Sequence, residues 1–294
     1  MLLCLVNPAS GRGRSLRIAE DLCRGLRKAG REVVLESSKG PGWIARRASS
    51  APEGTTAVIA VGGDGTINEV VNGFFENEDP IGKDATLAII PHGTGMDFCR
   101  ILDRQHSGEQ RMVDLMKVLY TTPDGASRIR YAINVTSFGM GGEVAARVSR
   151  STKPFGAIVA FLSSTLAIAL NFSGNSVTLQ LDNSKTIKSK VTNVVVGNGQ
   201  YHGAGMWVCP GAVVDDGLLD VTIIGHLTLL ELLRNIPTLY TGGIYSHPKV
   251  QSYKVKHLKA DSREPVLIEI DGEALGRLPL EISVLPQAIR VSLP

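Results

Sequence analysis

The sequence predicts an N-terminal doubly wound α/β domain followed by a C-terminal antiparallel β-sandwich domain with inserted helices. The first observation is that apolar strand-like runs alternate with helical patterns as far as about residue 120, as in parallel sheets that are buried on both faces. The second is a change at residues 123–125, after which strands and turn dipeptides dominate. A length of 294 residues also suits two domains. We therefore expect one domain at residues 1–124 and a second at residues 125–294.

The elements of the first domain follow from its hydrophobic pattern. The expected strands are short apolar runs at residues 2–6, 33–35, 57–61 and 86–90. The expected helices carry apolar residues at helical spacing, at residues 18–30, 43–50 and 67–75. Strands that alternate with helices in this way are joined by crossovers, which predicts a parallel sheet.

The second domain reads mainly as strands. They are expected at residues 131–138, 177–181, 191–196, 219–224, 250–255, 266–270 and 282–285. Helices are expected near residues 140–170 and 228–240. The longest apolar stretch, residues 155–170, is shorter than the roughly 20 residues that span a bilayer. It therefore favours a core helix, with contact at a lipid interface as the alternative.

Composition excludes several classes of protein. A hydrophobic fraction of 43% and a charged fraction of 20% are typical of a globular chain. A net charge of +3 is too small to indicate a nucleic-acid partner. The 4 cysteines form no CxxC pair, and the N-terminal segment lacks the basic region of a signal peptide. We therefore expect a cytoplasmic protein with reduced thiols and no transmembrane segment, and peripheral contact with a membrane is the alternative.

The strongest motif is Gly-Gly-Asp-Gly-Thr-Ile-Asn-Glu at residues 62–69, where the third expected strand turns into a helix. Glycines let the backbone approach a ligand closely, and a helix N-terminus favours an anion, so the motif predicts a phosphate site. The alternative is purely structural, because Thr66 and Glu69 have the spacing of a capping box.

Two more glycine-containing loops follow strands of the same expected sheet. They are Asn-Pro-Ala-Ser-Gly-Arg-Gly at residues 7–13 and Pro-His-Gly-Thr-Gly-Met-Asp at residues 91–97. Each alone is compatible with an ordinary turn, with Asp97 as a helix cap in the second. Open α/β sheets bind ligands at the carboxyl ends of their strands, so three such loops together predict a ligand site there.

In this order, NPASGRG, GGDGTINEV and PHGTGMDF resemble the catalytic domain of the diacylglycerol kinase, sphingosine kinase and ceramide kinase family, in particular its small soluble bacterial lipid kinases. Segments at residues 198–206, 209–212, 215–221 and 271–273 resemble the second domain of these enzymes. The resemblance covers nearly the whole chain. It implies an ATP- and Mg²⁺-dependent kinase of phospholipid metabolism that phosphorylates the hydroxyl of a diacylglycerol-like or sphingoid lipid.

The resemblance also implies which residues contact the nucleotide. The ATP phosphates would lie on the first two loops, with Ser38 and Thr94 close to the nucleotide. The implied nucleotide-binding residues are Asn7, Pro8, Ala9, Ser10, Gly11, Ser38, Gly63, Asp64, Gly65, Thr66, Ile67, Asn68, Glu69 and Thr94. One position departs from the family pattern, because Met96 stands where an Asn usually precedes Asp97. A thioether cannot replace the hydrogen bonds of an amide.

The same resemblance implies metal sites. Asp64, Asp97 and Asp114 match acidic positions linked to the catalytic magnesium, and Asp64 is also implied in catalysis. The Asp216 carboxylate and the Val213 and Leu218 carbonyls match a structural magnesium site. Without the resemblance, the Asp215-Asp216-Gly217 turn would read as an ordinary hairpin turn.

Residues 271–273 supply the implied catalytic base. The resemblance makes Glu273 the acceptor of the substrate hydroxyl proton, with the catalytic Asp271 close by. The alternative is again a hairpin turn between two strands.

The expected partners are ATP and a lipid substrate at the membrane surface, with residues 155–170 in contact with the lipid tail. No nucleic acid is expected, and a homodimer is left open. One alternative function is an NAD kinase-like enzyme, which shares the GGDGT turn but normally carries its Asn-Glu pair in a separate motif. The other is a non-catalytic lipid- or nucleotide-binding protein, which the departure at Met96 suggests.

Overall fold

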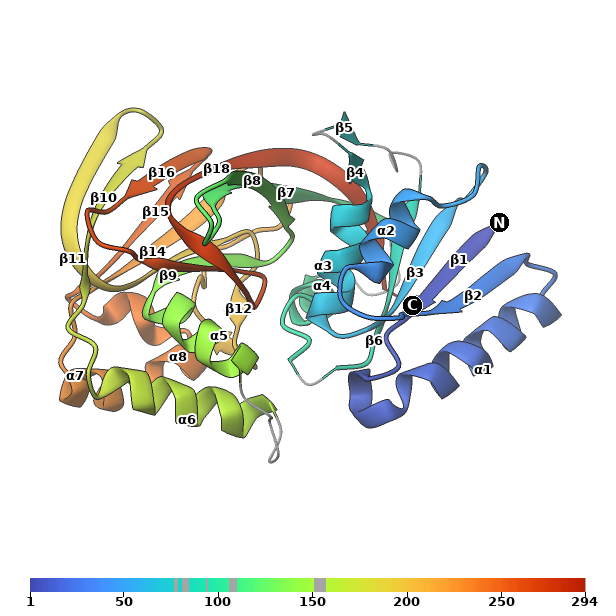
Figure 1. Cartoon of the computed structure of the whole chain (residues 1–294), viewed down its shortest axis with the longest axis horizontal. Helices are drawn as coiled ribbons and strands as arrows, with labels where there is room; N and C mark the ends of the chain where they lie inside the picture. The colour runs from blue at the N-terminus through green and yellow to red at the C-terminus, as the bar shows by residue number, and fades with distance from the viewer. Residues whose placement is uncertain (77–78, 81–84, 94, 106–109, 151–156, 294) are drawn as a thin grey trace. The chain divides into compact units, whose positions relative to one another are not determined.

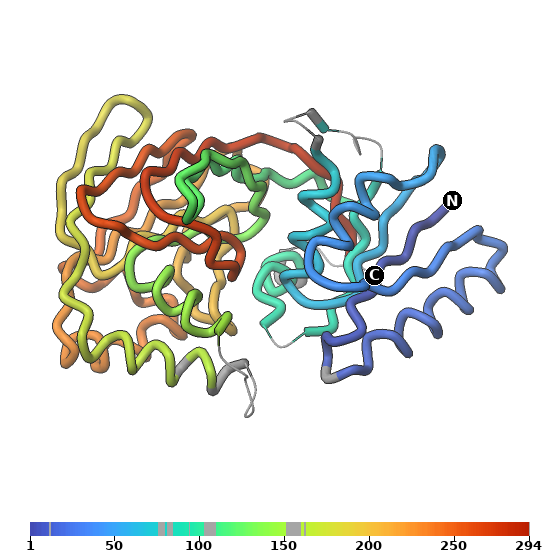
Figure 2. Tube along the Cα trace, viewed as in Figure 1, coloured from blue at the N-terminus to red at the C-terminus, as the bar shows by residue number. Residues whose placement is uncertain are grey.

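The protein is seen in a computed structural model that describes residues 1–76, 79–80, 85–93, 95–105, 110–150 and 157–293. The chain divides into two compact units, Met1–Val113 with Gln287–Pro294, and Asp114–Pro286. The division thus falls before the expected boundary at residues 124 and 125. The backbone N–H of Asp114 already donates to Val214 of the second unit. The C-terminal end of the chain also returns to the first unit, as the trace in Figure 2 shows.

The first unit contains a parallel sheet in the order β2-β1-β3-β6 (Figure 1). These strands are β2 (Val33–Ser37), β1 (Leu2–Val6), β3 (Ala57–Gly62) and β6 (Thr86–Pro91). The end of β18 (Glu273–Ser292) adds a further parallel strand beside β6. The expected strands of this domain are therefore confirmed.

Helices cover both faces of this sheet. The apolar side of α1 (Ser15–Lys28) packs against one face, which includes Leu2, Cys4 and Val6. The alternating residues Leu3 and Leu5 are fully buried on the other face. The remaining short elements of this unit are η1 (Ser10–Gly13), α2 (Trp43–Ser49), α3 (Asp64–Gly73), β4 (Phe75–Glu76), β5 (Asp79–Pro80) and α4 (Cys99–Gln105).

The second unit is built mainly from antiparallel strands. They are β7 (Gln110–Thr121), β8 (Ser127–Ala132), β9 (Val135–Gly139), β10 (Asn175–Leu181), β11 (Lys185–Gly197), β14 (Leu219–Gly225), β15 (Val250–Val255), β16 (His257–Asp261), β17 (Leu267–Ile270) and most of β18. The pairings β9–β11–β10–β16–β18–β17–β9 form a closed circuit around an apolar core. The predicted β-rich domain is confirmed in this broad sense.

One expected strand is divided. Residues 131–138 were expected to form a single strand, but β8 ends at Ala132 and β9 begins at Val135. The backbone N–H groups of Ile133, Asn134 and Val135 all donate to the Asp271 carboxylate. Since a side chain takes these donors, the strand ladder is interrupted here.

Inserted helices complete the second unit. They are α5 (Met140–Arg150), α6 (Ala157–Ala169), α7 (Leu229–Asn235), α8 (Thr238–Thr241) and η2 (Gly243–Ser246), and the hairpin β12 (Tyr201–His202) with β13 (Met206–Trp207) is a separate small sheet. Among the described helices, none is both long enough and apolar enough to cross a membrane.

Candidate functional site

Three loops meet at the carboxyl edge of the parallel sheet in the first unit. A Cβ atom on Gly11 would lie 2.0 Å from the His92 ring, and one on Gly93 would lie 2.6 Å from the Gly63 Cα. Strand β1 has β2 on one side and β3 on the other, so the chain reverses its winding direction here. Such a switch point is where open α/β sheets bind ligands. The structure thus brings the three motif loops together.

The loop after β1 is held by its own side chains. The Asn7 Oδ1 atom accepts the Ala9 N–H at 3.0 Å, and the Ser10 hydroxyl contacts the Asn7 carbonyl at 2.7 Å and the Ser15 hydroxyl at 2.6 Å. Gly11 has φ of +56°, a backbone conformation that residues other than Gly, Asn and Asp rarely adopt. The side chains therefore shape this loop, and its backbone is the part that is suited to contact a phosphate.

In the second loop, helix α3 begins at Asp64 with Gly63 as its N-cap. The side chains of Thr66, Ile67 and Asn68 are buried, with exposed fractions of 3%, 1% and 0%. The capping-box alternative is wrong, because no side chain caps this helix. Because these side chains are buried, a nucleotide at this loop would contact its backbone atoms.

The Glu69 side chain has a different structural task. Its carboxylate accepts the backbone N–H groups of Gly42 at 3.2 Å and Ile44 at 3.0 Å, at the start of helix α2. Carboxylates stabilise helix N-termini by accepting the unpaired N–H groups there. Glu69 therefore holds α2 against α3.

Asp64 and Asp97 form a close acidic pair in this unit. The Asp64 carboxylate accepts the backbone N–H groups of Asp97 at 3.3 Å and Phe98 at 3.4 Å. The pKa of the Asp64 carboxyl is raised above its ordinary value, first by burial and then by the charge of Asp97. A Cβ atom on Gly95 would lie 3.0 Å from one Asp64 oxygen and 3.6 Å from one Asp97 oxygen. Two hard oxygen donors that repel each other are suited to Mg²⁺.

Met96 directly precedes Asp97 and has φ of +55°, in the left-handed region. Its backbone N–H also interacts with the Asp64 carboxylate. Asn adopts this conformation far more readily than Met does. Met96 in place of the usual Asn therefore strains the backbone, in addition to removing the side-chain hydrogen bonds of an amide.

Two further positions were expected near the nucleotide. The Ser38 hydroxyl donates to the Gly40 carbonyl at 3.1 Å and accepts the Gly40 N–H at 3.3 Å, so it shapes the loop after β2. Thr94 lies outside the described residues.

Asp114 belongs to the second unit. Its side chain is fully buried and accepts the Gly217 N–H at 2.7 Å. This geometry favours support of the turn at residues 214–217 over the role at a catalytic magnesium that the resemblance implies.

Of the three residues implied at the structural magnesium, Asp216 already has two partners. One Asp216 oxygen accepts the Leu218 N–H at 3.0 Å, and the other is 2.9 Å from the Lys254 ammonium. The ammonium therefore lies beside the one carboxylate at which the resemblance implies a cation, and the roles of the Val213 and Leu218 carbonyls stay a prediction.

In the turn between β17 and β18, the two acidic residues of the implied catalytic base, Asp271 and Glu273, have different surroundings. Asp271 accepts three backbone N–H groups, from Ile133 at 2.9 Å, Asn134 at 3.1 Å and Val135 at 2.9 Å. Its carboxylate is thus fixed and buried, which favours a structural role over the catalytic one. The Glu273 side chain is 40% exposed, and its carboxylate is 2.9 Å from the Arg130 guanidinium. Of the two, Glu273 is the one that a substrate could reach.

Sequence reasoning missed Glu269. This carboxylate is fully buried and accepts the Gly272 N–H and the Ser137 hydroxyl, both at 2.6 Å, and lies 3.4 Å from the His202 ring. It supports the turn that carries Glu273. The signal was its place between two apolar residues of a buried strand, Ile268 and Ile270, where a charge needs partners.

Comparisons with known proteins match both parts of the chain. The family model described as "Diacylglycerol kinase catalytic domain" matches residues 1–124, and "YegS C-terminal NAD kinase beta sandwich-like domain" matches residues 134–293. A protein of Mycobacterium tuberculosis named diacylglycerol kinase is 28% identical over 99% of this chain and 94% of that protein. A protein of Xanthomonas oryzae named "Probable lipid kinase YegS-like" is 28% identical over 92% of this chain and 89% of that protein.

Solved structures share the fold. A crystal structure from Bacillus anthracis aligns with a TM-score of 0.75 at 23% identity and covers 99% of this chain and 96% of that chain. A yeast NADH kinase structure aligns with a TM-score of 0.53 at 11% identity and covers 100% of this chain and 82% of that chain. At these identities the alignments show a common fold and carry no statement about activity.

Proposed function

Because the chain belongs to the diacylglycerol kinase catalytic-domain family, whose domain is joined here to a YegS-type C-terminal domain, we propose that it is an ATP- and Mg²⁺-dependent lipid kinase. The acceptor would be the hydroxyl of a diacylglycerol-like or sphingoid lipid. The observation that carries the proposal is the pair of a half-buried Asp64 and a buried Asp97, which lies beside the N-terminus of α3 where three motif loops meet.

The first unit would bind the nucleotide. The N-terminus of α3 and the backbone of residues 63–65 offer N–H groups and a positive partial charge to phosphate. The loop at residues 7–11 would add further backbone contacts on the other side of the switch point. Asp64 and Asp97 would hold Mg²⁺, which supplies neutralisation of the charge on the phosphate oxygens during transfer.

Glu273 would accept the proton of the lipid hydroxyl. In the transfer, the hydroxyl oxygen forms a bond to the γ-phosphorus, the bond between that phosphorus and the ADP oxygen breaks, and the proton moves to the carboxylate. Arg130 would orient the carboxylate through its contact at 2.9 Å, and Glu269 would fix the turn behind it.

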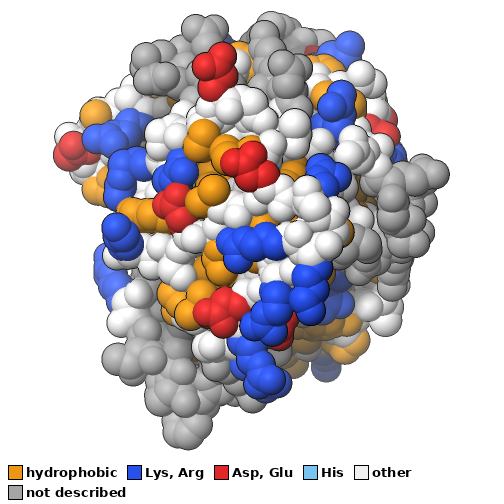
Figure 3. Space-filling model, turned by 90° about the vertical axis from the view of Figure 1, so that its right-hand side faces the viewer, with side chains coloured by type: hydrophobic (Ala, Val, Ile, Leu, Met, Phe, Trp, Pro, Cys, Tyr) orange, Lys and Arg blue, Asp and Glu red, His pale blue; other side chains and the backbone are white. Residues whose placement is uncertain are grey.

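A basic face of the first unit would support peripheral contact with anionic lipid. Figure 3 shows many Lys and Arg side chains on the face that it draws, with Asp and Glu side chains among them. A shallow hollow of the first unit is lined by Glu20, Arg24, Arg27, Lys28 and Leu35. Since Arg27 and Arg24 already contact the Val33 carbonyl and Asp21, respectively, we expect weak attraction rather than tight binding.

The apolar part of the lipid would meet helices α6 and α7 of the second unit. Leu166 and Leu170, on and just after α6, are 49% and 60% exposed, and Leu230 on α7 is 57% exposed. A Cβ atom on Gly174, beyond α6, would lie 2.8 Å from the His226 ring, before α7, so the segment after α6 meets the segment before α7. Residues 155–156 of the expected tail-binding stretch lie outside the described residues.

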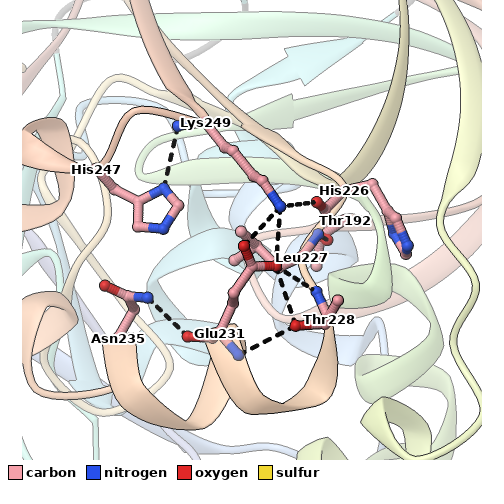
Figure 4. A network of polar contacts seen from close by, with 8 residues as sticks. All are labelled: Thr192, His226, Leu227, Thr228, Glu231, Asn235, His247 and Lys249. Carbon is pink, nitrogen blue, oxygen red and sulfur yellow. Dashed lines mark hydrogen bonds and ion pairs between the residues drawn. The ribbon is translucent and has the colours of Figure 1, made fainter.

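Helix α7 is anchored firmly at its start (Figure 4). Thr228 and Glu231 form a capping box, and the Lys249 ammonium lies 2.7 Å from the Glu231 carboxylate and 3.2 Å from the His226 carbonyl. Exposed leucines on an anchored helix are suited to contact a lipid chain without reorganisation of the helix.

Transfer of labelled γ-phosphate tests the proposal. The protein would be given labelled ATP and Mg²⁺ with diacylglycerol vesicles, a sphingoid base, or NAD, and each product would be identified by mass spectrometry. Label in a lipid supports the proposal. Label in NAD alone would support the NAD kinase-like alternative, and label in none of them would favour a binding protein.

A further inference from the structure

Lys254 lies among oxygen atoms of three residues of the second unit, two in the turn at residues 211–218 and one on β14. Its ammonium nitrogen is 2.9 Å from the Asp216 carboxylate, 3.1 Å from the Asp220 carboxylate and 3.1 Å from the Gly211 carbonyl. Lys254 is on β15, directly opposite Asp220 on β14 in the antiparallel register. The ammonium therefore joins the turn at residues 211–218 to the two strands that flank it.

The charges of this cluster require a cation. The Asp220 side chain is only 6% exposed, and a Cβ atom on Gly211 would lie 2.8 Å from its second oxygen. An enclosed carboxylate needs a charged partner, and the ammonium is 3.1 Å from this one and 2.9 Å from the Asp216 carboxylate. The Lys254 ammonium is therefore placed as the counter-ion to both carboxylates.

A divalent cation would compete with groups that are already in place. It would need an Asp216 oxygen, and both are taken, one by the Leu218 N–H and the other by Lys254. It would also lie beside a second positive charge. The turn is fixed independently, because Gly217 donates to the Asp114 carboxylate and Asp114 donates to the Val214 carbonyl, both at 2.7 Å.

We infer that the Lys254 ammonium takes the place of the structural divalent cation that the family resemblance implies at Asp216, so that the turn at residues 211–218 is held without a metal. Of the residues implied to hold that cation, Asp216 is retained as a partner of the ammonium, and Gly211 and Asp220 supply its other oxygen contacts. Removal of the ammonium should then leave a cluster of oxygen atoms with no cation, which a divalent ion could enter.

The test measures thermal unfolding in EDTA and in MgCl₂ for the wild type, Asp216→Asn, Lys254→Ala and the double variant. Asn at position 216 can still accept the Leu218 N–H, so the turn should form. Magnesium bound in the first unit would shift all four proteins alike. We expect the same shift in the wild type and in Asp216→Asn.

Lys254→Ala should have a lower melting temperature in EDTA. Magnesium should then raise it by about 5–10 °C more than in the wild type, at a concentration about a hundredfold above the Kd. The double variant should lose this extra shift, and Lys254→Arg, which keeps the charge, should not gain it. An extra shift that is confined to Lys254→Ala supports the inference.

Two results would overturn the inference. A magnesium shift that is smaller in Asp216→Asn than in the wild type would mean that the natural protein already binds a cation at Asp216. A folded Lys254→Ala without an extra shift would mean that the ammonium occupies no latent cation site. The comparison of the wild type with Asp216→Asn decides the first point even where Lys254→Ala fails to fold.

Discussion

Asp64→Asn should lower the phosphate-transfer activity of the protein without lowering its stability. Asn is nearly isosteric with Asp, and its Oδ1 atom can still accept a backbone N–H group, whereas the Asp64 carboxylate accepts those of Asp97 and Phe98 at 3.3 and 3.4 Å and also interacts with that of Met96. The lost contact is long, so its removal should cost no more than about 1 kcal/mol. The fold should therefore survive.

The stability effect follows from the pKa of Asp64. Burial and the neighbouring Asp97 raise it in the folded state. An acid whose folded pKa is raised binds its proton more tightly in the folded than in the unfolded protein, so stability falls as pH rises from the unfolded pKa through the folded one. At neutral pH the ionised carboxylate therefore opposes folding. In EDTA, Asp64→Asn should unfold at a temperature equal to or above that of the wild type.

The activity effect has the opposite sign. Loss of the charge that would organise Mg²⁺ at the phosphates should lower turnover by at least about a hundredfold, the scale of one electrostatic contact in a transition state. Magnesium with ATP should raise the melting temperature of the wild type more than that of the variant. The assay pairs phosphate transfer with thermal unfolding at several pH values.

Near-normal turnover in a folded Asp64→Asn protein would refute the assignment. A variant that is clearly less stable than the wild type in EDTA at neutral pH would refute the argument about burial and repulsion. Asp21→Asn on the exposed face of α1 is the matched control, since it removes a carboxylate at a surface ion pair and should change neither quantity.

Three further substitutions test other parts of the site. Met96→Asn should raise the free energy of unfolding by about 1 kcal/mol, because Asn tolerates the left-handed backbone at this position, and a chemical denaturation curve that is unchanged would contradict this explanation. Glu273→Gln should lower single-turnover phosphate transfer by about 10²–10⁴-fold and leave ATP binding nearly intact, whereas an unchanged rate would make Glu273 a turn residue only. Asp271→Asn places an amide N–H₂ opposite the Ile133 N–H and should cost about 1–3 kcal/mol in urea denaturation, and a variant of wild-type stability would show that the buried contact contributes nothing.

The parallel half of the fold was predictable from the sequence because its signals are local. Continuous apolar strands alternate with amphipathic helices, and that pattern alone places the loops after β1, β3 and β6 at one edge. The meeting of Gly11 with His92 and of Gly63 with Gly93 follows from this geometry.

The partners of the acidic residues were not predictable, because they depend on strand register. Asp220 faces Lys254 only because β14 and β15 pair in one particular register, and Asp271 reaches residues 133–135 across the domain. In the sequence, Asp271 belongs to a turn dipeptide and Asp220 to an expected strand, and neither signal gives information about distant partners. Glu69 is similar, since the helix that it caps starts at a residue far from it in the chain.

Transfer of the γ-phosphate of ATP to a lipid hydroxyl at the Asp64–Asp97 pair is the activity that we propose for this chain. To test it, labelled ATP and Mg²⁺ are added to an extracted lipid pool with the wild type and, in parallel, with Asp64→Asn. We expect one labelled phospholipid, identified by mass spectrometry, whose formation requires Mg²⁺ and falls at least about a hundredfold in the variant. No labelled lipid with the wild type, or equal labelling by both proteins, would contradict it.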